Sequence, residues 1–150
     1  MSKKLLYIDI DGVLLGKIDP GSPEIVLANH AKEFLEYCLA NYKCYWISTH
    51  CKNGSAAAAI NIFKQYADEF VINLVRSILP TSWGTLKTEA IDFSSDFYLV
   101  DDQLLYTEID GLYKNNSFEK WININTRVNP DDLMVALSIL QEKDIYGSVA

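Results

Sequence analysis

The sequence contains no apolar run long enough to span a membrane. A transmembrane helix needs about 20 predominantly apolar residues, and every apolar run in this 150-residue chain is far shorter. The basic residues 1–4 precede the apolar residues 5–8, but Asp9 and Asp11 interrupt this run and no small-residue cleavage site follows. We therefore interpret residues 5–10 as a buried strand and not a signal peptide, and we expect a cytoplasmic protein without membrane contact.

Clusters of cysteine and histidine are also missing. The chain has three cysteines, Cys38, Cys44 and Cys51, none in a CxxC pair, and two histidines, His30 and His50. A structural zinc site needs about four such ligands together, so the sequence does not predict one. An odd number of cysteines at these spacings is typical of reduced thiols in the cytosol.

Positive charge is scarce, with 13 Lys and Arg against 20 Asp and Glu and a formal net charge of -7. The phosphate backbone of nucleic acids rewards clustered Lys and Arg, so nucleic-acid binding is not favoured. Repeats, linkers and low-complexity tracts are absent from the sequence, and its composition is 49% apolar and 22% charged. This length and composition predict a single globular domain over residues 1–150.

Short apolar runs alternate along the chain with segments of helical periodicity. The apolar runs predict strands, at residues 5–10, 43–47, 70–75, 97–100 and 121–124. Capping residues and helical spacing predict helices, from Ser22 with Pro23 in its first turn, from Ser55, over 85–92, and from Asn129 with Pro130 in its first turn. Residues 12–21 hold two glycines ahead of an Asp-Pro-Gly turn signal, so we expect a loop or hairpin there.

This alternation predicts an α/β fold, a Rossmann-like three-layer sandwich with a mostly parallel five-stranded sheet. In such sheets ligands bind beyond the carboxyl ends of the strands. The polar residues that close the first, second and fourth strands, with one lysine ahead of the fourth, are Asp9, Asp11, Ser48, Thr49, Asp101, Asp102 and Lys87. We expect these side chains to converge at one edge of the sheet.

Such a convergence has chemical consequences. Carboxylates crowded together repel one another unless a cation lies among them. Their hard oxygen atoms suit Mg²⁺, which commonly binds one or two carboxylates, waters and a substrate phosphate. Lys87 adds a positive charge and Ser48 a hydroxyl, and both suit a phosphoryl group. The cluster therefore predicts Mg²⁺ as cofactor and a phosphorylated substrate.

The four motifs together resemble those of the haloacid dehalogenase-like hydrolase superfamily, over residues 5–102. An apolar strand leads into Asp9-Ile10-Asp11-Gly12, and Ser48 closes the strand Tyr45-Trp46-Ile47. Lys87 stands at a helix start, and Asp101-Asp102 closes the strand Tyr98-Leu99-Val100. One such motif occurs by chance, whereas all four in this order on the expected elements make a specific pattern.

The resemblance implies a role for each matching residue. Asp9 would attack phosphorus and form an aspartyl-phosphate. Asp11 would act first as general acid and then as general base. Ser48, Lys87 and the backbone amides up to Gly12 would bind the phosphoryl group.

The resemblance also implies the metal ligands, which are Asp9, the backbone carbonyl of Asp11, Asp101 and Asp102. The sequence leaves two points open. Thr49 could replace Ser48 as the phosphate-binding hydroxyl if the strand ends one residue later. Either Asp101 or Asp102 could touch the metal directly, with the other acting through water.

The sequence leaves little room for the cap domain that covers the site in many superfamily members. About ten residues separate Gly12 from Ser22, and residues 48–87 are filled by one expected helix, one expected strand and a short loop. We therefore expect an open site. By resemblance, open sites accept a phosphate on a large molecule, such as a protein, nucleic-acid end, lipid or glycan, and some use a partner protein as a lid.

Two other functions have to be weighed. A catalytically weak module could bind phosphoryl groups or a partner, but every expected catalytic residue is present. A signalling receiver domain would carry its acidic pair at the first strand and its phosphorylated Asp in the middle strand, opposite to the order here.

Near the site, His50 and Cys51 could line the pocket or pack, and Lys52 and Arg127 could form a basic rim or be surface residues.

Overall fold

The computed structural model describes residues 3–147. Its strands are β1 (Lys4–Ile8), β2 (Leu15–Gly16), β3 (Val26–Leu27), β4 (Tyr42–Trp46), β5 (Phe97–Asp101) and β6 (Trp121–Asn123). Its α-helices are α1 (Ala31–Asn41), α2 (Ala57–Phe63), α3 (Glu69–Val75), α4 (Tyr106–Lys114) and α5 (Asp132–Gly147). Three short 3₁₀ helices complete it, η1 (Thr49–Cys51), η2 (Lys87–Ala90) and η3 (Phe118–Lys120).

The main sheet is parallel and has the strand order β4-β1-β5-β6. The α/β prediction with a parallel sheet is confirmed, but the sheet has four strands and not five. Because β1 lies between β4 and β5, the carboxyl ends of these three strands meet at one edge. This edge is where the predicted site residues follow the strands.

The predicted third strand at 70–75 was wrong, because these residues form α3. Asp68 caps the helix by accepting a hydrogen bond from the Val71 N–H at 3.0 Å. Val71, Ile72 and Val75 are buried while Phe70 is 51% exposed, a pattern of helical and not alternating period. The sheet edge beside β4 holds instead a single parallel bridge between Tyr45 and Leu79.

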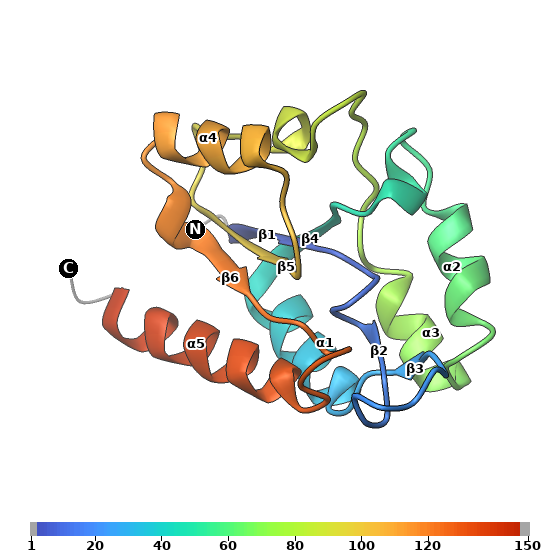
Figure 1. The fold of residues 1–150 in the computed structure, drawn as a ribbon. Coiled ribbons are helices and arrows are strands. Elements are labelled where there is room, and N and C mark those ends of the chain that lie inside the picture. The colour runs from blue at the N-terminus through green and yellow to red at the C-terminus, as the bar shows by residue number, and fades with distance from the viewer. Residues whose placement is uncertain (1–2, 148–150) are drawn as a thin grey trace.

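Helices cover both faces of the sheet (Figure 1). Leu6 and Ile8 of β1 point into a core shared with α1, α3 and α5, while Tyr7 between them packs with Leu112 of α4 on the other face. This alternation follows from the two-residue period of a strand. Burying each large side chain contributes about 1.5–3 kcal/mol to stability. The cores on the two faces of the sheet together fix the position of the strand ends.

The predicted helix start at Ser22 and Pro23 was also wrong. The Ser22 hydroxyl accepts a hydrogen bond from the Glu24 N–H at 3.2 Å, which makes a local turn and not a helix cap. The following β3 pairs with β2 in an antiparallel hairpin, and α1 begins only after His30, whose φ is 67°. β-branched and aliphatic residues such as Val26 favour this extended segment.

The region between the first and third motifs contains no inserted domain among the described residues 3–147. The β2–β3 hairpin is the one paired element between β1 and α1. The helices α2 and α3 pack through Phe63 and Val75 into the core shared with α1. In the described part of the chain, no helix has the length and apolar character needed to cross a membrane.

Candidate functional site

A hollow of about 520 Å³ lies at the carboxyl edge of the sheet. We call it the carboxyl-edge hollow, and its wall includes Asp9, Asp11, Thr49, Lys87, Asp102 and Arg127. These residues come from the segments after β1, β4, β5 and β6 and from η2. The predicted motif residues, distant in sequence, thus meet at one place.

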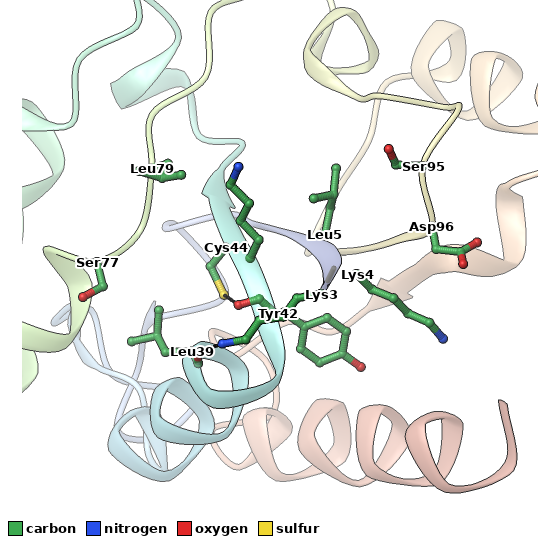
Figure 2. A pocket seen from close by; sticks show the side chains of 11 residues that line it. Lys3, Lys4, Leu5, Leu39, Tyr42, Cys44, Ser77, Leu79, Ser95 and Asp96 are labelled. Atoms are coloured by element: carbon green, nitrogen blue, oxygen red, sulfur yellow. Dashed lines mark hydrogen bonds between the residues drawn. The ribbon is translucent and has the colours of Figure 1, made fainter. Parts of the chain in front are cut away.

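A larger hollow of about 690 Å³ opens at the opposite edge of the sheet, among Lys3, Lys4, Tyr42 and Cys44 (Figure 2). Three of its lining residues are lysines, Lys3, Lys4 and Lys43. Lys3 Nζ donates to the Leu39 carbonyl at 3.3 Å, and Lys4 Nζ lies 5.6 Å from the ring centre of Tyr98. Asp96 is the one carboxylate in its lining, so it lacks the group of acidic oxygen atoms that the smaller carboxyl-edge hollow has.

Three carboxylates form the centre of the site. Oxygen atoms of Asp9, Asp101 and Asp102 all lie within 4.8 Å of one another, and Asp9 and Asp101 are only 6% and 0% exposed. Burial and the neighbouring Asp9 charge raise the pKa of Asp101 above its ordinary value, against the opposing effect of Lys87. The same two causes raise the pKa of Asp102. Such a crowded, buried group of hard oxygen atoms fits a divalent cation such as Mg²⁺.

Lys87 joins two of these carboxylates. Its Nζ lies 2.7 Å from Asp101 Oδ2 and 3.4 Å from Asp9 Oδ2. Burial lowers the pKa of Lys87, but the charges of Asp9 and Asp101 outweigh burial and leave the pKa raised. The side chain therefore stays an ammonium and reduces the repulsion between the two carboxylates.

Sequence reasoning missed a further carboxylate at the site, the buried Glu108 of α4. Glu108 is 3% exposed, and its two oxygens accept hydrogen bonds from the backbone N–H groups of Lys87 at 2.6 Å and Leu105 at 2.8 Å. The spacing Leu105-x-x-Glu108 is half of a capping box and marks the start of α4, a helix that the sequence analysis did not predict. No sequence motif predicts the contact between Glu108 and Lys87, because the two residues belong to separate elements.

Gly12 fits the site because it has no side chain. Its φ is 78°, and an added Cβ would lie 2.2 Å from Asp102 Oδ2. Its N–H donates to the Leu15 carbonyl at 2.8 Å, and its carbonyl accepts from the Thr126 N–H at 2.9 Å. The glycine therefore lets the loop after β1 approach Asp102, while its own N–H is engaged by the hairpin.

Asp11 is oriented by side chains from two other elements. His50 Nε2 lies 2.8 Å from Asp11 Oδ2, and Arg127 Nη2 lies 3.8 Å from Asp11 Oδ1. His50 belongs to η1 and Arg127 follows β6. The sequence left His50 as either a pocket or a packing residue, and the structure shows that it contacts Asp11, a predicted catalytic residue. Its neighbour Cys51 is fully buried in the core and thus packs.

The two candidate hydroxyls lie at different depths. Ser48 is buried, and its Oγ accepts a hydrogen bond from the His50 N–H at 3.1 Å, which caps η1. Thr49 lines the carboxyl-edge hollow, whereas Ser48 does not. The structure therefore places Thr49 at the wall and Ser48 beneath it.

The site combines a carboxylate beside an ammonium, a second carboxylate two residues later, and a group of acidic oxygens that suits a cation. This set can perform nucleophilic and acid–base chemistry on an anionic substrate. No protein-family model matches the chain, and no curated protein matches it.

Proposed function

We propose that the protein is a Mg²⁺-dependent phosphomonoesterase of the haloacid dehalogenase-like type, built on a Rossmann-like three-layer fold and acting through Asp9. One observation carries the proposal. The carboxylate oxygens of the buried Asp9 and Asp101 and of the half-buried Asp102 come within 4.8 Å of one another, and Lys87 bridges two of these residues. A nucleophile, a cation site and a fixed positive charge at one sheet edge are what phosphoryl transfer requires.

The cation would be held by the four residues that the motifs assign, Asp9, Asp11 through its backbone carbonyl, Asp101 and Asp102. Asp102 lines the carboxyl-edge hollow, while Asp101 is paired with Lys87 at 2.7 Å, so direct ligation is assigned to Asp102. When bound, Mg²⁺ supplies neutralising charge and polarises the phosphoryl oxygens.

Asp9 is held ready for attack. Its Oδ1 accepts a hydrogen bond from the Ile10 N–H at 2.8 Å, and its Oδ2 lies near Lys87. A carboxylate oxygen of Asp9 would attack phosphorus, and the bond from phosphorus to the leaving oxygen would break. The product is an aspartyl-phosphate on Asp9.

Asp11 would donate its proton to the leaving oxygen. It would then take a proton from water, which attacks the aspartyl-phosphate, releases inorganic phosphate and restores Asp9. His50 and Arg127 hold the Asp11 carboxylate from two sides. Lys87, with the hydroxyl of Thr49 or Ser48, would bind the phosphoryl oxygens.

The absence of an inserted domain among residues 3–147 leaves the carboxyl-edge hollow open to a large substrate. We therefore extend the proposal to a phosphate on a macromolecule, or to one presented by a partner protein. The buried, free thiols Cys38, Cys44 and Cys51 fit a reducing cytoplasm.

The direct test is phosphate release from 4-nitrophenyl phosphate with and without Mg²⁺. We expect release by the wild type that needs the metal and is lost in Asp9→Asn. Asp96→Asn, which changes an exposed aspartate at the opposite sheet edge, is the matched control and should retain release. If a folded wild type neither binds Mg²⁺ nor releases phosphate, the phosphomonoesterase proposal fails and a phosphoryl-binding module takes its place.

A further inference from the structure

Two cations in the wall of the carboxyl-edge hollow have no assigned contact with the substrate in the proposal above, although one of them, Arg127, lies beside Asp11. They are Lys52, just after η1, and Arg127, after β6. The chain is acidic and contains only two arginines, Arg76 and Arg127. One of them is thus placed at the site.

Lys52 has no carboxylate partner within salt-bridge distance in the part of the chain that the structure describes. Its Nζ lies 5.4 Å from the ring centre of Trp83 and 3.5 Å from the Gly84 carbonyl. Trp83 also lines the hollow. The aromatic ring positions the ammonium by a cation–π contact but leaves its charge available to an anion.

Arg127 is held at its backbone and only weakly paired at its head. Its N–H donates to Asn125 Oδ1 at 2.9 Å, which fixes the loop. Its Nη2 lies 3.8 Å from Asp11, and its buried Nε has no hydrogen-bond partner among the described residues. A guanidinium has five N–H donors in a planar fork that matches phosphate oxygens, so most of its binding capacity is free.

The acidic residues of the hollow have roles in the proposal above, because Asp9 and Asp102 would hold the cation and the Asp11 carboxylate contacts His50 and Arg127. Lys87 is paired with Asp9 and Asp101, and Glu108 accepts two backbone N–H bonds. Leu104 and Leu105 form an apolar part of the same wall, which strengthens nearby electrostatic interactions. Lys52 and Arg127 are therefore the cations of this wall that can meet a second anion.

We propose that Lys52 and Arg127 form a subsite for a second phosphate group on the leaving side of the substrate. The substrate class is then a phosphomonoester whose leaving group carries another phosphate, and the inference rests on the proposed phosphomonoesterase function. That chemistry has two sources, a small bisphosphate or the phosphodiester next to the terminal phosphate of an oligonucleotide.

The test compares kcat/KM for matched substrate pairs. Fructose 6-phosphate and fructose 1,6-bisphosphate form one pair, and adenosine 5′-monophosphate and 5′-phosphorylated diadenylate form the other. The wild type should prefer the second member of at least one pair by about tenfold or more, the value of one charge-assisted contact. The pair that shows the preference identifies the source, and added salt should weaken it.

Substitutions at Lys52 and Arg127 test whether these residues cause the preference for a second phosphate. Lys52→Met and Arg127→Gln should each reduce it about tenfold, and Lys52→Arg should keep most of it. Lys43→Ala is the matched control, because Lys43 is exposed and lines the opposite hollow. Lys52 is exposed, so its variants should fold. Binding of fructose 1,6-bisphosphate to Asp9→Asn in Mg²⁺ buffer, by calorimetry, should weaken in parallel when Lys52→Met is added.

The outcomes separate the two proposals. Asp9-dependent hydrolysis of 4-nitrophenyl phosphate without any preference for a second phosphate would overturn the subsite alone. A preference that survives both Lys52→Met and Arg127→Gln would overturn it too. Absence of Asp9-dependent hydrolysis on every substrate would overturn the phosphomonoesterase function and the subsite with it.

Discussion

The carboxylate of Glu108 accepts a 2.6 Å hydrogen bond from the backbone N–H of Lys87. Its other oxygen accepts from Leu105 at the start of α4, so one buried side chain joins η2 to α4. Lys87 lies between Asp9 and Asp101 only if η2 is held in place. Glu108 is thus a positioning residue, because it acts through Lys87.

Glu108→Gln should lower kcat by about tenfold and destabilise the fold by about 1–3 kcal/mol, because the uncharged amide has one carbonyl oxygen where the carboxylate has two acceptors. KM should change little if the effect acts through Lys87 on the transition state. Glu119→Gln, an exposed glutamate of η3, is the control. Steady-state kinetics and urea unfolding measure both effects, and loss of stability with unchanged kcat would assign Glu108 a purely structural role.

Mg²⁺ should raise the melting temperature of the wild type, because the ion binds the folded carboxylate cluster. A concentration of about 100 Kd stabilises by about 2.7 kcal/mol. Asp102→Asn should remove most of this shift while keeping the fold, since Asp102 lines the hollow. Thermal unfolding at a series of Mg²⁺ concentrations measures the effect, and an equal shift in wild type and Asp102→Asn would exclude Asp102 as a ligand.

Gly12→Ala should destabilise the protein for two separable reasons, its left-handed backbone and the close approach to Asp102. Gly54 provides a matched control, because its φ is 85° but nothing lies within 4 Å of an added Cβ. Gly54→Ala should cost about 1–2 kcal/mol for the backbone alone. Gly12→Ala should cost at least about 1 kcal/mol more. Chemical denaturation measures both, and equal costs would mean that Asp102 moves aside freely.

The strand ends of the site could be predicted from the sequence because they depend on local patterns. The apolar run before Asp9 and the one before Asp101 each correspond to a strand of the parallel sheet. Polar residues after such runs meet at one edge by topology alone. This part of the site needs no knowledge of long-range contacts.

The failures concern segments whose local patterns were compatible with two structures. The run Phe70–Val75 suits a strand by composition, and it is the Asp68 cap together with burial against α1 that makes it helical. The segment at Val26 follows the misleading helix signal at Ser22, and its pairing with β2 makes it a strand. In both cases tertiary contacts override local propensity.

The side-chain contacts that the sequence did not predict join distant elements. Glu108 meets Lys87 across 21 positions of sequence, and His50 meets Asp11 across 39. A single sequence carries no signal for such pairs. The half capping box at Glu108 could have revealed α4, but not the contact with η2.

Stability should fall as pH rises above about 9, because buried thiols resist ionisation. Burial raises the pKa of Cys44 to about 12, partly opposed by the charge of Lys3, and burial also raises the pKa of Cys38. Below the thiol pKa of the unfolded chain, about 8.5, both states bind the proton and stability is fully present. Above it, the unfolded chain loses protons that the folded state keeps, so each thiol lowers the unfolding free energy by about 1.4 kcal/mol per pH unit.

Cys44→Ala isolates one of these thiols. Between about pH 9 and pH 11, the unfolding free energy of the variant should fall less steeply with pH, by the slope that corresponds to about one proton. This difference does not depend on what the substitution does to stability at pH 7. The hydroxyls of Tyr37 and Tyr42 both donate to Asp144, and burial raises the pKa of each. These tyrosines act in the same direction and are retained in both proteins, so the difference in slope belongs to Cys44. Urea unfolding at half-unit pH steps measures both slopes, and parallel curves would mean that the thiol ionises freely in the folded state, contrary to its burial in the core.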